Sequence, residues 1–222
     1  MKKTVFIFFL ISLNCFSWSD LTVKYMIVNA YKAFPSGLKF YLEGYKREIL
    51  KGADSLKEED FSSANEVEKF ICREREKIAK MIKGRNKPKK VAFELGKMFK
   101  AVAILSYPFS FEQSFYSRDY RSYTEFKLPK FVFAFNRIKL KDFKGKKCSS
   151  LVDSLYDEAS ELKKKILEDY EIYENSSHFD DLSAAFGSGS LLFSKSCFLM
   201  SSLALDIWLE VNGSPEGALI LK

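Results

Sequence analysis

The stretch from Val91 to Ser110, VAFELGKMFKAVAILSYPFS, places the strongest constraint on how this chain folds. It is apolar on nearly every side, and a helix with that pattern is buried inside a protein. Its polar residues Glu94, Lys97 and Lys100 are three residues apart, so they share one face of the helix. Pro108 ends the pattern, because proline disfavours helix at and before its own position. The sequence therefore predicts a buried central helix whose narrow polar stripe needs partners.

Segments on both sides of this stretch predict further helices around a single core. Apolar residues recur at helical spacing in residues 21–34, 38–50, 67–82 and 151–170, and residues 182–211 form a long, largely apolar run. Residues 111–126 have no clear period and predict a loop with at most a short helix. Residues 127–140 are strand-like in their Phe and Val content, although Pro129 argues against a central strand. At 222 residues with 47% hydrophobic content, the chain is long enough for one well-buried domain.

The N-terminus has the features of a secretory signal peptide. A short basic start and an apolar run precede Cys15-Phe16-Ser17, whose small residues suit a signal peptidase cut before Trp18. The apolar run is too short to span a membrane. We therefore expect residues 1–17 to be a signal peptide and residues 18–222 to be an exported domain, periplasmic or secreted, without a transmembrane helix. An N-terminal membrane anchor and a lipidated Cys15 are the alternatives.

Charge and cysteine content narrow the class of function. The formal net charge is +7, with lysines spread along predicted helices and loops, which favours solvated faces over a dedicated anion-binding surface. Basic and aromatic residues interleave only within residues 115–123, so we expect no nucleic-acid partner. Without Cys15, the cysteines are Cys72, Cys148 and Cys197, which lack CxxC spacing. This odd set allows at most one internal disulfide, and we expect buried free thiols.

Several short motifs, taken in order, resemble a known family. Phe34-Pro35 ends the first predicted helix and Gly52-Ala53 the second, while Leu95, Gly96 and Pro108 match the spacing of a Leu-Gly-x-x-x-His-x-x-x-Asp-x-x-x-Pro-x-His motif. With a tryptophan at the expected mature N-terminus, this order resembles the zinc-dependent phospholipase C family and the related single-strand nucleases. The resemblance implies an all-α, single-domain multi-helix bundle, the fold of secreted hydrolases that hold a trinuclear zinc site.

The same resemblance assigns positions to the zinc ligands, and most of them carry residues that do not bind zinc. These positions are Trp18, Val23, Lys57, Lys100, Ile104, Ser110, Arg121 and Glu125. Lysine and arginine are cationic near neutral pH and repel a metal. We therefore expect no catalytic residue and no zinc or other metal cofactor. Because a buried ammonium needs a partner, we expect Lys100, and with it Arg121, to pair with Glu125 in place of the lost metal. Snorkelling of Lys100 to the surface is the alternative.

The remaining residues offer little catalytic chemistry. The only histidine, His178, lies in a polar loop, which favours a surface or helix-capping role over metal binding. Gly187-Ser188-Gly189-Ser190 lies inside a helical run, which indicates helix packing and not a nucleophile elbow. Glu94, Glu112 and Glu125 are able to act as acids or bases, but nearby lysines and Arg121 favour ion pairing.

These features predict an exported pseudoenzyme. It would have a scaffold resembling zinc-dependent phospholipase C, without the metal, and would bind a lipid, an envelope component or a protein partner through the former cleft. The first alternative is an active phosphodiester hydrolase with a reduced or altered metal set. The second is a purely structural envelope protein. An open cleft lined by carboxylates would favour the hydrolase. An open cleft without carboxylates would favour a binding protein, and a filled site would favour a structural role.

Overall fold

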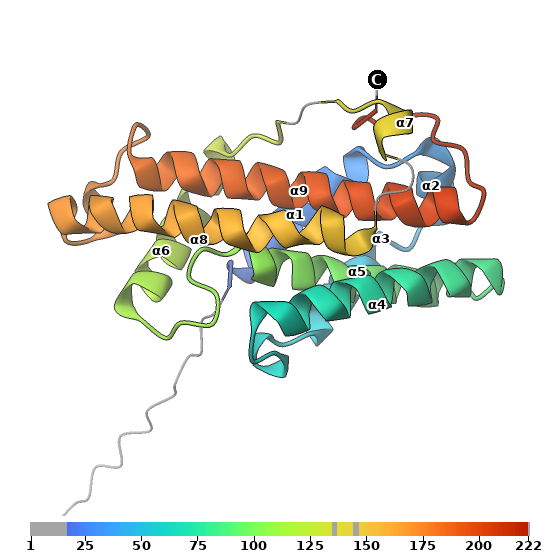
Figure 1. The fold of residues 1–222 in the computed structure, drawn as a ribbon, viewed down its shortest axis with the longest axis horizontal. Helices are drawn as coiled ribbons and strands as arrows, with labels where there is room; N and C mark the ends of the chain where they lie inside the picture. The colour runs from blue at the N-terminus through green and yellow to red at the C-terminus, as the bar shows by residue number, and fades with distance from the viewer. Residues whose placement is uncertain (1–16, 135–136, 144–146, 222) are drawn as a thin grey trace, which may run out of the picture.

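The computed structural model describes residues 17–134, 137–143 and 147–221, and in this part the chain is all-helical (Figure 1). The helices are α1 (Asp20–Lys32), α2 (Ser36–Tyr41), α3 (Lys46–Ser55), α4 (Ala64–Lys83), α5 (Pro88–Ser106), α6 (Phe115–Lys127), α7 (Leu140–Phe143), α8 (Cys148–Tyr173) and α9 (Ala184–Glu210), with short 3-10 turns η1 (Glu58–Asp60), η2 (Leu128–Lys130) and η3 (Ser176–His178). The described residues contain no β-strand, only an isolated parallel bridge between Ile138 and Leu221. The predicted all-α class is confirmed. Most of the expected signal peptide, residues 1–16, lies outside the described residues.

Helix α5 is the centre of the bundle, as its composition predicts. Pro88 occupies its first turn, where a missing N–H costs nothing. From Met98 to Ser106 every residue of α5 is buried. Helices α1, α3, α4, α8 and α9 all pack against it. Figure 1 shows the long helices α4, α5, α8 and α9 running roughly along the longest axis of the molecule.

The contact between α3 and α5 is unusually close because a glycine lies on each helix. A Cβ atom added at Gly52 would lie 1.9 Å from the carbonyl oxygen of Phe93, and one added at Gly96 would lie 1.9 Å from that of Ile49. Since no other residue fits at such distances, the two backbones touch directly at this crossing. The two glycines of the quoted motifs thus meet in space, and their contact fixes α3 and the loop that follows it relative to α5.

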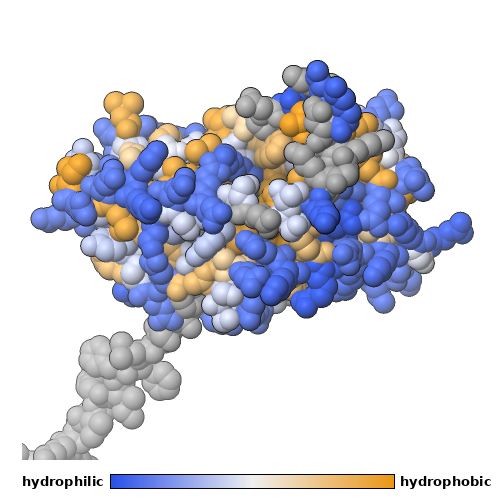
Figure 2. Space-filling view, in the orientation of Figure 1, coloured by the Kyte–Doolittle hydropathy of each residue, from blue (hydrophilic) through white to orange (hydrophobic). Residues whose placement is uncertain are grey.

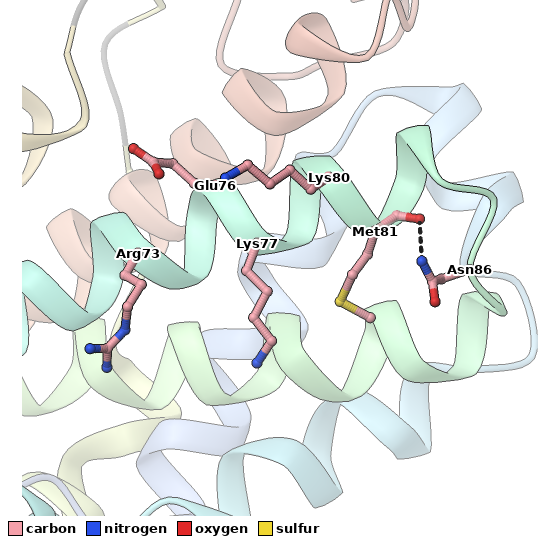
Figure 3. A pocket seen from close by; sticks show the side chains of 6 residues that line it. All are labelled: Arg73, Glu76, Lys77, Lys80, Met81 and Asn86. Atoms are coloured by element: carbon pink, nitrogen blue, oxygen red, sulfur yellow. Dashed lines mark hydrogen bonds between the residues drawn. The ribbon is translucent and has the colours of Figure 1, made fainter.

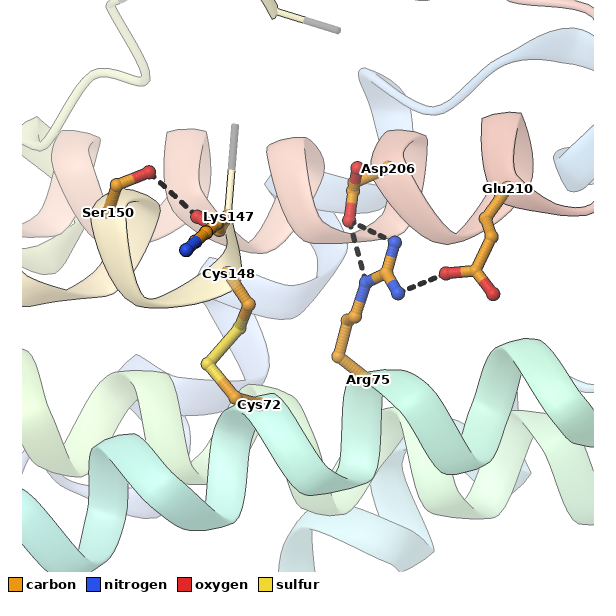
Figure 4. The surroundings of a disulfide bond; sticks show 7 residues. All are labelled: Cys72, Arg75, Lys147, Cys148, Ser150, Asp206 and Glu210. Carbon is orange, nitrogen blue, oxygen red and sulfur yellow. Dashed lines mark hydrogen bonds and ion pairs between the residues drawn. A yellow bond between two sulfur atoms is a disulfide. The ribbon is translucent and has the colours of Figure 1, made fainter. Parts of the chain in front are cut away.

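A disulfide joins α4 to the first turn of α8 (Figure 4). Cys72 and Cys148 are 76 residues apart in sequence, and their Cα atoms are 5.6 Å apart. The expectation of free thiols is therefore wrong for this pair, because neighbouring helices bring together two partly exposed cysteines that are distant in sequence. Cys197 is a buried free thiol, as expected. Beside the disulfide, Arg75 on α4 pairs with Asp206 and Glu210 on α9.

Two predicted segments have a different structure. Residues 38–50 do not form one helix: the chain breaks between α2 and α3, where Gly44 adopts a φ of +81°. Residues 115–127 form helix α6 and not a loop. Its inward face carries amphipathic residues, so the hydrophobic period is weak, yet Tyr120 and Tyr123 bury their rings and donate their hydroxyls to the carbonyl oxygens of Ala185 and Asp180. After α6 the described chain forms η2 and an extended segment, not a strand.

Helix α9 is long and apolar, and most of its apolar surface is buried inside the bundle. Among the described residues, it is the one helix long and apolar enough to cross a membrane, and 72% of its most apolar window is buried in the fold. It packs against α1, α5 and α8. This burial is typical of the core helix of a folded domain.

Candidate ligand-binding pocket

A charged pocket of about 390 Å³ opens where α1, α3, α5 and α6 approach one another. The first turn of α1, the end of α3 with turn η1, the middle of α5 and the middle of α6 each contribute to it. Its lining residues are Asp20, Lys24, Ala53, Asp54, Leu56, Lys57, Glu58, Glu59, Lys100 and Arg121. The pocket therefore carries four carboxylates and four cations. Three positions that the resemblance assigns to zinc ligands, Lys57, Lys100 and Arg121, meet here.

Lys100 lies at the floor of this pocket and is only 5% exposed. Its Nζ atom is 3.3 Å from Asp20 Oδ1 and 3.6 Å from Glu58 Oε1. Glu58 is also nearly buried and accepts a hydrogen bond from the hydroxyl of Ser17. Partial burial acts to raise the pKa of Asp20, but the charge and hydrogen bond of Lys100 outweigh it and hold that pKa below its usual value. The buried ammonium is thus compensated by two carboxylates.

The predicted pairing of Lys100 with Glu125 is wrong. Glu125 is exposed and lies one helical turn beyond Arg121 on α6, outside the residues that line the pocket. The carboxylates that compensate Lys100 come from α1 and η1 instead. Asp20 suits this role because it lies in the first turn of α1, where the helix dipole also stabilises negative charge. Snorkelling is equally excluded, since the Lys100 side chain is buried.

The other expected ligand positions are part of the hydrophobic core or its edge. Val23 and Ile104 are buried apolar residues. Ser110 is buried and donates its hydroxyl to the carbonyl oxygen of Ile104. Trp18 is fully buried, and its Nε1 atom donates to Ser106 Oγ at 3.0 Å. These positions stabilise the fold and offer no side chain to a ligand.

The donor set of the pocket does not fit the zinc that the resemblance implies. Among the described residues, no three histidine, cysteine or carboxylate side chains are grouped so as to hold a metal ion. Asp20 and Glu58 pair with Lys100, and Asp54 pairs with Lys24 at 3.3 Å. A divalent cation would therefore have to displace ammonium groups from the carboxylates it needs.

Two of the three carboxylates considered for acid–base chemistry, Glu94 and Glu112, form ion pairs elsewhere, and Glu125 is exposed. Glu94 lies 3.1 Å from the Nζ atom of Lys97, as expected, and 2.9 Å from that of Lys77. Burial acts to raise the pKa of Glu94, but these two lysines lower it below its usual value. Glu112 pairs with Lys163 on α8 and not with the cations suggested by the sequence. None of these carboxylates lines the pocket.

The two remaining sequence candidates have structural roles. His178 is exposed in η3, which agrees with the surface role predicted from the sequence. Gly187 and Gly189 lie in the first turns of α9, and a Cβ atom at Gly189 would lie 2.9 Å from the Tyr120 hydroxyl. The glycine–serine run thus allows α6 to approach α9, in agreement with the packing interpretation.

Sequence reasoning missed the five other charged residues of the pocket: Asp20, Lys24, Asp54, Glu58 and Glu59. The charged loop after α3 was recognisable, but charge alone does not distinguish a solvated loop from a pocket wall. The signal was present in Lys100, because a lysine on an otherwise buried helix requires carboxylates from other elements.

No family model, no curated protein and no solved structure matches this chain. The fold and the site therefore define its class: an all-α domain with a buried lysine at the floor of a pocket of mixed charge.

Proposed function

We propose that this protein is an exported pseudoenzyme that binds a phosphorylated or carboxylated ligand, such as the headgroup of an envelope lipid, in the pocket around Lys100. The order of its sequence motifs resembles zinc-dependent phospholipase C, and lysine and arginine stand at three positions where this resemblance places metal ligands. The observation that carries the proposal is the meeting of Lys57, Lys100 and Arg121 in one open pocket.

Two of these cations are available to a ligand. Lys100 is committed to Asp20 and Glu58, whereas Lys57 and Arg121 form no ion pair within 4.0 Å of another described residue, and the charge of Arg121 acts on Asp20 from a longer distance. An arginine fork and a lysine ammonium together suit a phosphate or carboxylate group. Glu59 lines the same pocket, so a ligand with a positively charged part would find a partner as well. The volume of about 390 Å³ is in the range of small-molecule sites.

Calorimetric titration with glycerophosphoethanolamine and glycerophosphoglycerol tests this proposal. We expect Arg121→Ala to weaken binding at least about tenfold, the loss typical of one charge-assisted bidentate contact. Arg118→Ala is the matched control, because Arg118 is exposed on the same helix and does not line the pocket. No measurable binding of either compound, or equal weakening by both variants, would refute the proposal.

A phosphodiester hydrolase is the second candidate, and the carboxylates in the pocket favour it. Asp20, Asp54, Glu58 and Glu59 line an open cleft, the arrangement that an enzyme would need. Three of them are paired with lysines, however, which argues for charge compensation. Chelator-sensitive cleavage of a phosphodiester by the purified protein would establish the enzyme and overturn the binding proposal.

Export is supported by the disulfide between Cys72 and Cys148, since such bonds persist in oxidising compartments. The proposed cut lies between Ser17 and Trp18, both of which are buried in the folded chain. Cleavage would therefore precede folding, and it would remove the hydrogen bond that Ser17 donates to Glu58. Mass spectrometry of the protein from its native cell should find Trp18 at the N-terminus, and an intact Met1 or a lipid on Cys15 would contradict the cut.

A further inference from the structure

The connection between α4 and α5 concentrates positive charge at one end of the molecule. Residues 78–93 contain no acidic residue, and their six cations are Lys80, Lys83, Arg85, Lys87, Lys89 and Lys90. All six are exposed. Lys83 pairs with Glu210 at 2.8 Å, whereas the other five form no ion pair with a described residue. The sequence alone suggested dispersed lysines, but the short turn between α4 and α5, at one end of the bundle in Figure 1, carries Arg85 and Lys87, and the first turn of α5 adds Lys89 and Lys90.

The backbone of this turn is fixed and not merely a solvated loop. Helix α4 ends with two hydrogen bonds, from the N–H of Arg85 to the carbonyl oxygen of Ile82 and from the N–H of Asn86 to that of Met81, both at 2.9 Å. This motif needs a residue with positive φ, usually glycine, and here Arg85 adopts a φ of 55°. Pro88 then starts α5. Arg85 thus lies at the tip of the hairpin, and its backbone has a conformation that glycine would adopt with less strain.

Neighbouring elements extend the basic surface. Tyr41 at the end of α2 donates its hydroxyl to the carbonyl oxygen of Asn86 at 3.3 Å, which places α2 beside the hairpin. Helix α3 begins next to the same end with exposed Lys46 and Arg47. Two of the acidic residues here, Glu48 and Glu210, pair with Lys51 and with Arg75 and Lys83, and the third, Glu43, is exposed. We call this surface the basic end: Lys46, Arg47, Arg85, Lys87, Lys89 and Lys90.

A shallow pocket continues the basic end along α4 (Figure 3). It has a volume of about 350 Å³ and is lined by Arg73, Glu76, Lys77, Lys80, Met81 and Asn86. Arg73 and Lys77 point toward α5, and the amide of Asn86 donates to the carbonyl oxygen of Met81 at 3.1 Å, closing the pocket near the hairpin. Lys77 is already paired with Glu74 and Glu94, so the cations that this pocket adds to the basic end are Arg73 and Lys80.

An exposed aromatic residue lies on α2, the helix that contacts the hairpin through Tyr41. Phe40 is 78% exposed on α2, next to Tyr41, whose hydroxyl reaches the hairpin. An apolar side chain projecting from a cationic surface has no complement on a purely hydrophilic polyanion, but it fits the boundary between headgroups and acyl chains of a bilayer. At the opposite end of the bundle, the last turns of α8 carry Glu168 and Glu171, and Glu174 follows them. A negatively charged surface would therefore attract the basic end and repel the opposite end.

We propose that the basic end docks this protein on an anionic lipid bilayer, with Arg85 and the neighbouring lysines on lipid phosphates and Phe40 inserted between headgroups. Figure 2 shows hydrophilic residues covering the end where α4 and α5 meet. The docking surface is separate from the pocket around Lys100, which is formed by other parts of α1, α3 and α5. Failure of ligand binding in that pocket would therefore leave this proposal standing, and the converse also holds.

Co-sedimentation with vesicles tests the docking. The full exported chain should bind vesicles of phosphatidylcholine containing phosphatidylglycerol, release them at high salt, and bind pure phosphatidylcholine far more weakly. Arg85→Gly should weaken the binding about fivefold, the equivalent of roughly 1 kcal/mol per surface cation. This variant removes backbone strain, so misfolding will not explain a loss of binding. Phe40→Ser should weaken binding as well.

The matched control is Lys164→Gln with Lys165→Gln, two exposed cations on α8 that lie outside the basic end. Equal weakening by this control would show that net charge alone drives the binding and would overturn the proposal. So would equal binding to neutral vesicles. Unchanged binding of Phe40→Ser together with tight binding to heparin would identify a soluble polyanion as the partner, and would also overturn it.

Discussion

Lys100 is the residue on which the local energetics of the pocket depend, because its ammonium is buried between two carboxylates. Replacing it by methionine leaves Glu58 nearly buried without its cation, and we expect a loss of about 2–3 kcal/mol in the free energy of unfolding. A double-mutant cycle of Lys100→Met with Glu58→Gln, followed by urea unfolding, should give a coupling of about 1–2 kcal/mol. The same cycle with Glu125→Gln should be additive. Coupling to Glu125 and not to Glu58 would contradict the geometry described here.

Replacing Arg85 should raise the free energy of unfolding, whereas replacing Lys100 should lower it. Glycine adopts a φ of 55° without the clash of a Cβ atom, so Arg85→Gly should stabilise the protein by up to about 1 kcal/mol in urea unfolding. Asn212 is the control, since it has a φ of 61° in the same hydrogen-bonded motif at the end of α9. Asparagine tolerates this region better than arginine, so Asn212→Gly should gain less. Destabilisation by Arg85→Gly would mean that the arginine makes stabilising contacts that outweigh its backbone strain.

At the residue scale, the sequence predicted that Lys100 is buried and requires a carboxylate, but it did not predict which carboxylate. The burial of Lys100 and its requirement for a carboxylate follow from an apolar helix with one polar stripe. The identity of that carboxylate did not follow, because Asp20 and Glu58 are 80 and 42 residues away from Lys100 in sequence, and only the tertiary fold brings them together. The family resemblance predicted Glu125, which does not line the pocket.

At the scale of elements, the crossing of α3 and α5 makes a direct prediction. Gly96→Ala places a Cβ atom 1.9 Å from a backbone oxygen, which no side-chain rotation relieves, and should destabilise the protein by about 1–3 kcal/mol or more. Gly187→Ala is the matched control, because nothing lies within 4 Å of the added atom in α9. There we expect no loss, and a gain of up to about 1 kcal/mol from helix propensity. Thermal unfolding of both variants checks this, and equal effects would mean that the helices separate freely.

The disulfide between α4 and α8 is the second prediction for the elements. Closing a loop of 76 residues should stabilise the fold by about 4 kcal/mol through the entropy of the unfolded chain. Dithiothreitol should therefore lower the urea midpoint of the native chain, and Cys72→Ser with Cys148→Ser should lower it permanently and abolish the effect of the reductant. Cys197→Ala should keep the sensitivity to dithiothreitol, since Cys197 is a free thiol. A native chain indifferent to the reductant would show that the bond does not form.

Helices were predictable where one face is uniformly apolar. Helices α4, α5, α8 and α9 have long apolar runs or stripes, so their existence followed from spacing alone. Helix α6 was missed because its buried face is built from Ser117, Tyr120, Tyr123 and Thr124, whose polar atoms find partners only in the folded state. The break at Gly44 was missed because the residues on both sides continue the same apolar period.

At the scale of the whole molecule, the bundle separates two charged surfaces. The pocket around Lys100 contains balanced charges, whereas the basic end carries mostly unpaired cations. Membrane docking through one surface and ligand binding through the other would be independent events. The all-α class was predictable from helical periodicity, but the placement of these surfaces depends on the α3–α5 crossing and on the α4–α5 turn, which no single segment encodes.

The central claim is that lysine and arginine have replaced the metal chemistry that the resemblance implies. Elemental analysis of the purified mature protein after dialysis tests it most directly. Because ammonium groups already compensate the carboxylates of the pocket, we expect zinc and other divalent metals well below one equivalent per chain. Stoichiometric zinc retained after dialysis, together with phosphodiesterase activity that a chelator abolishes, would contradict the account.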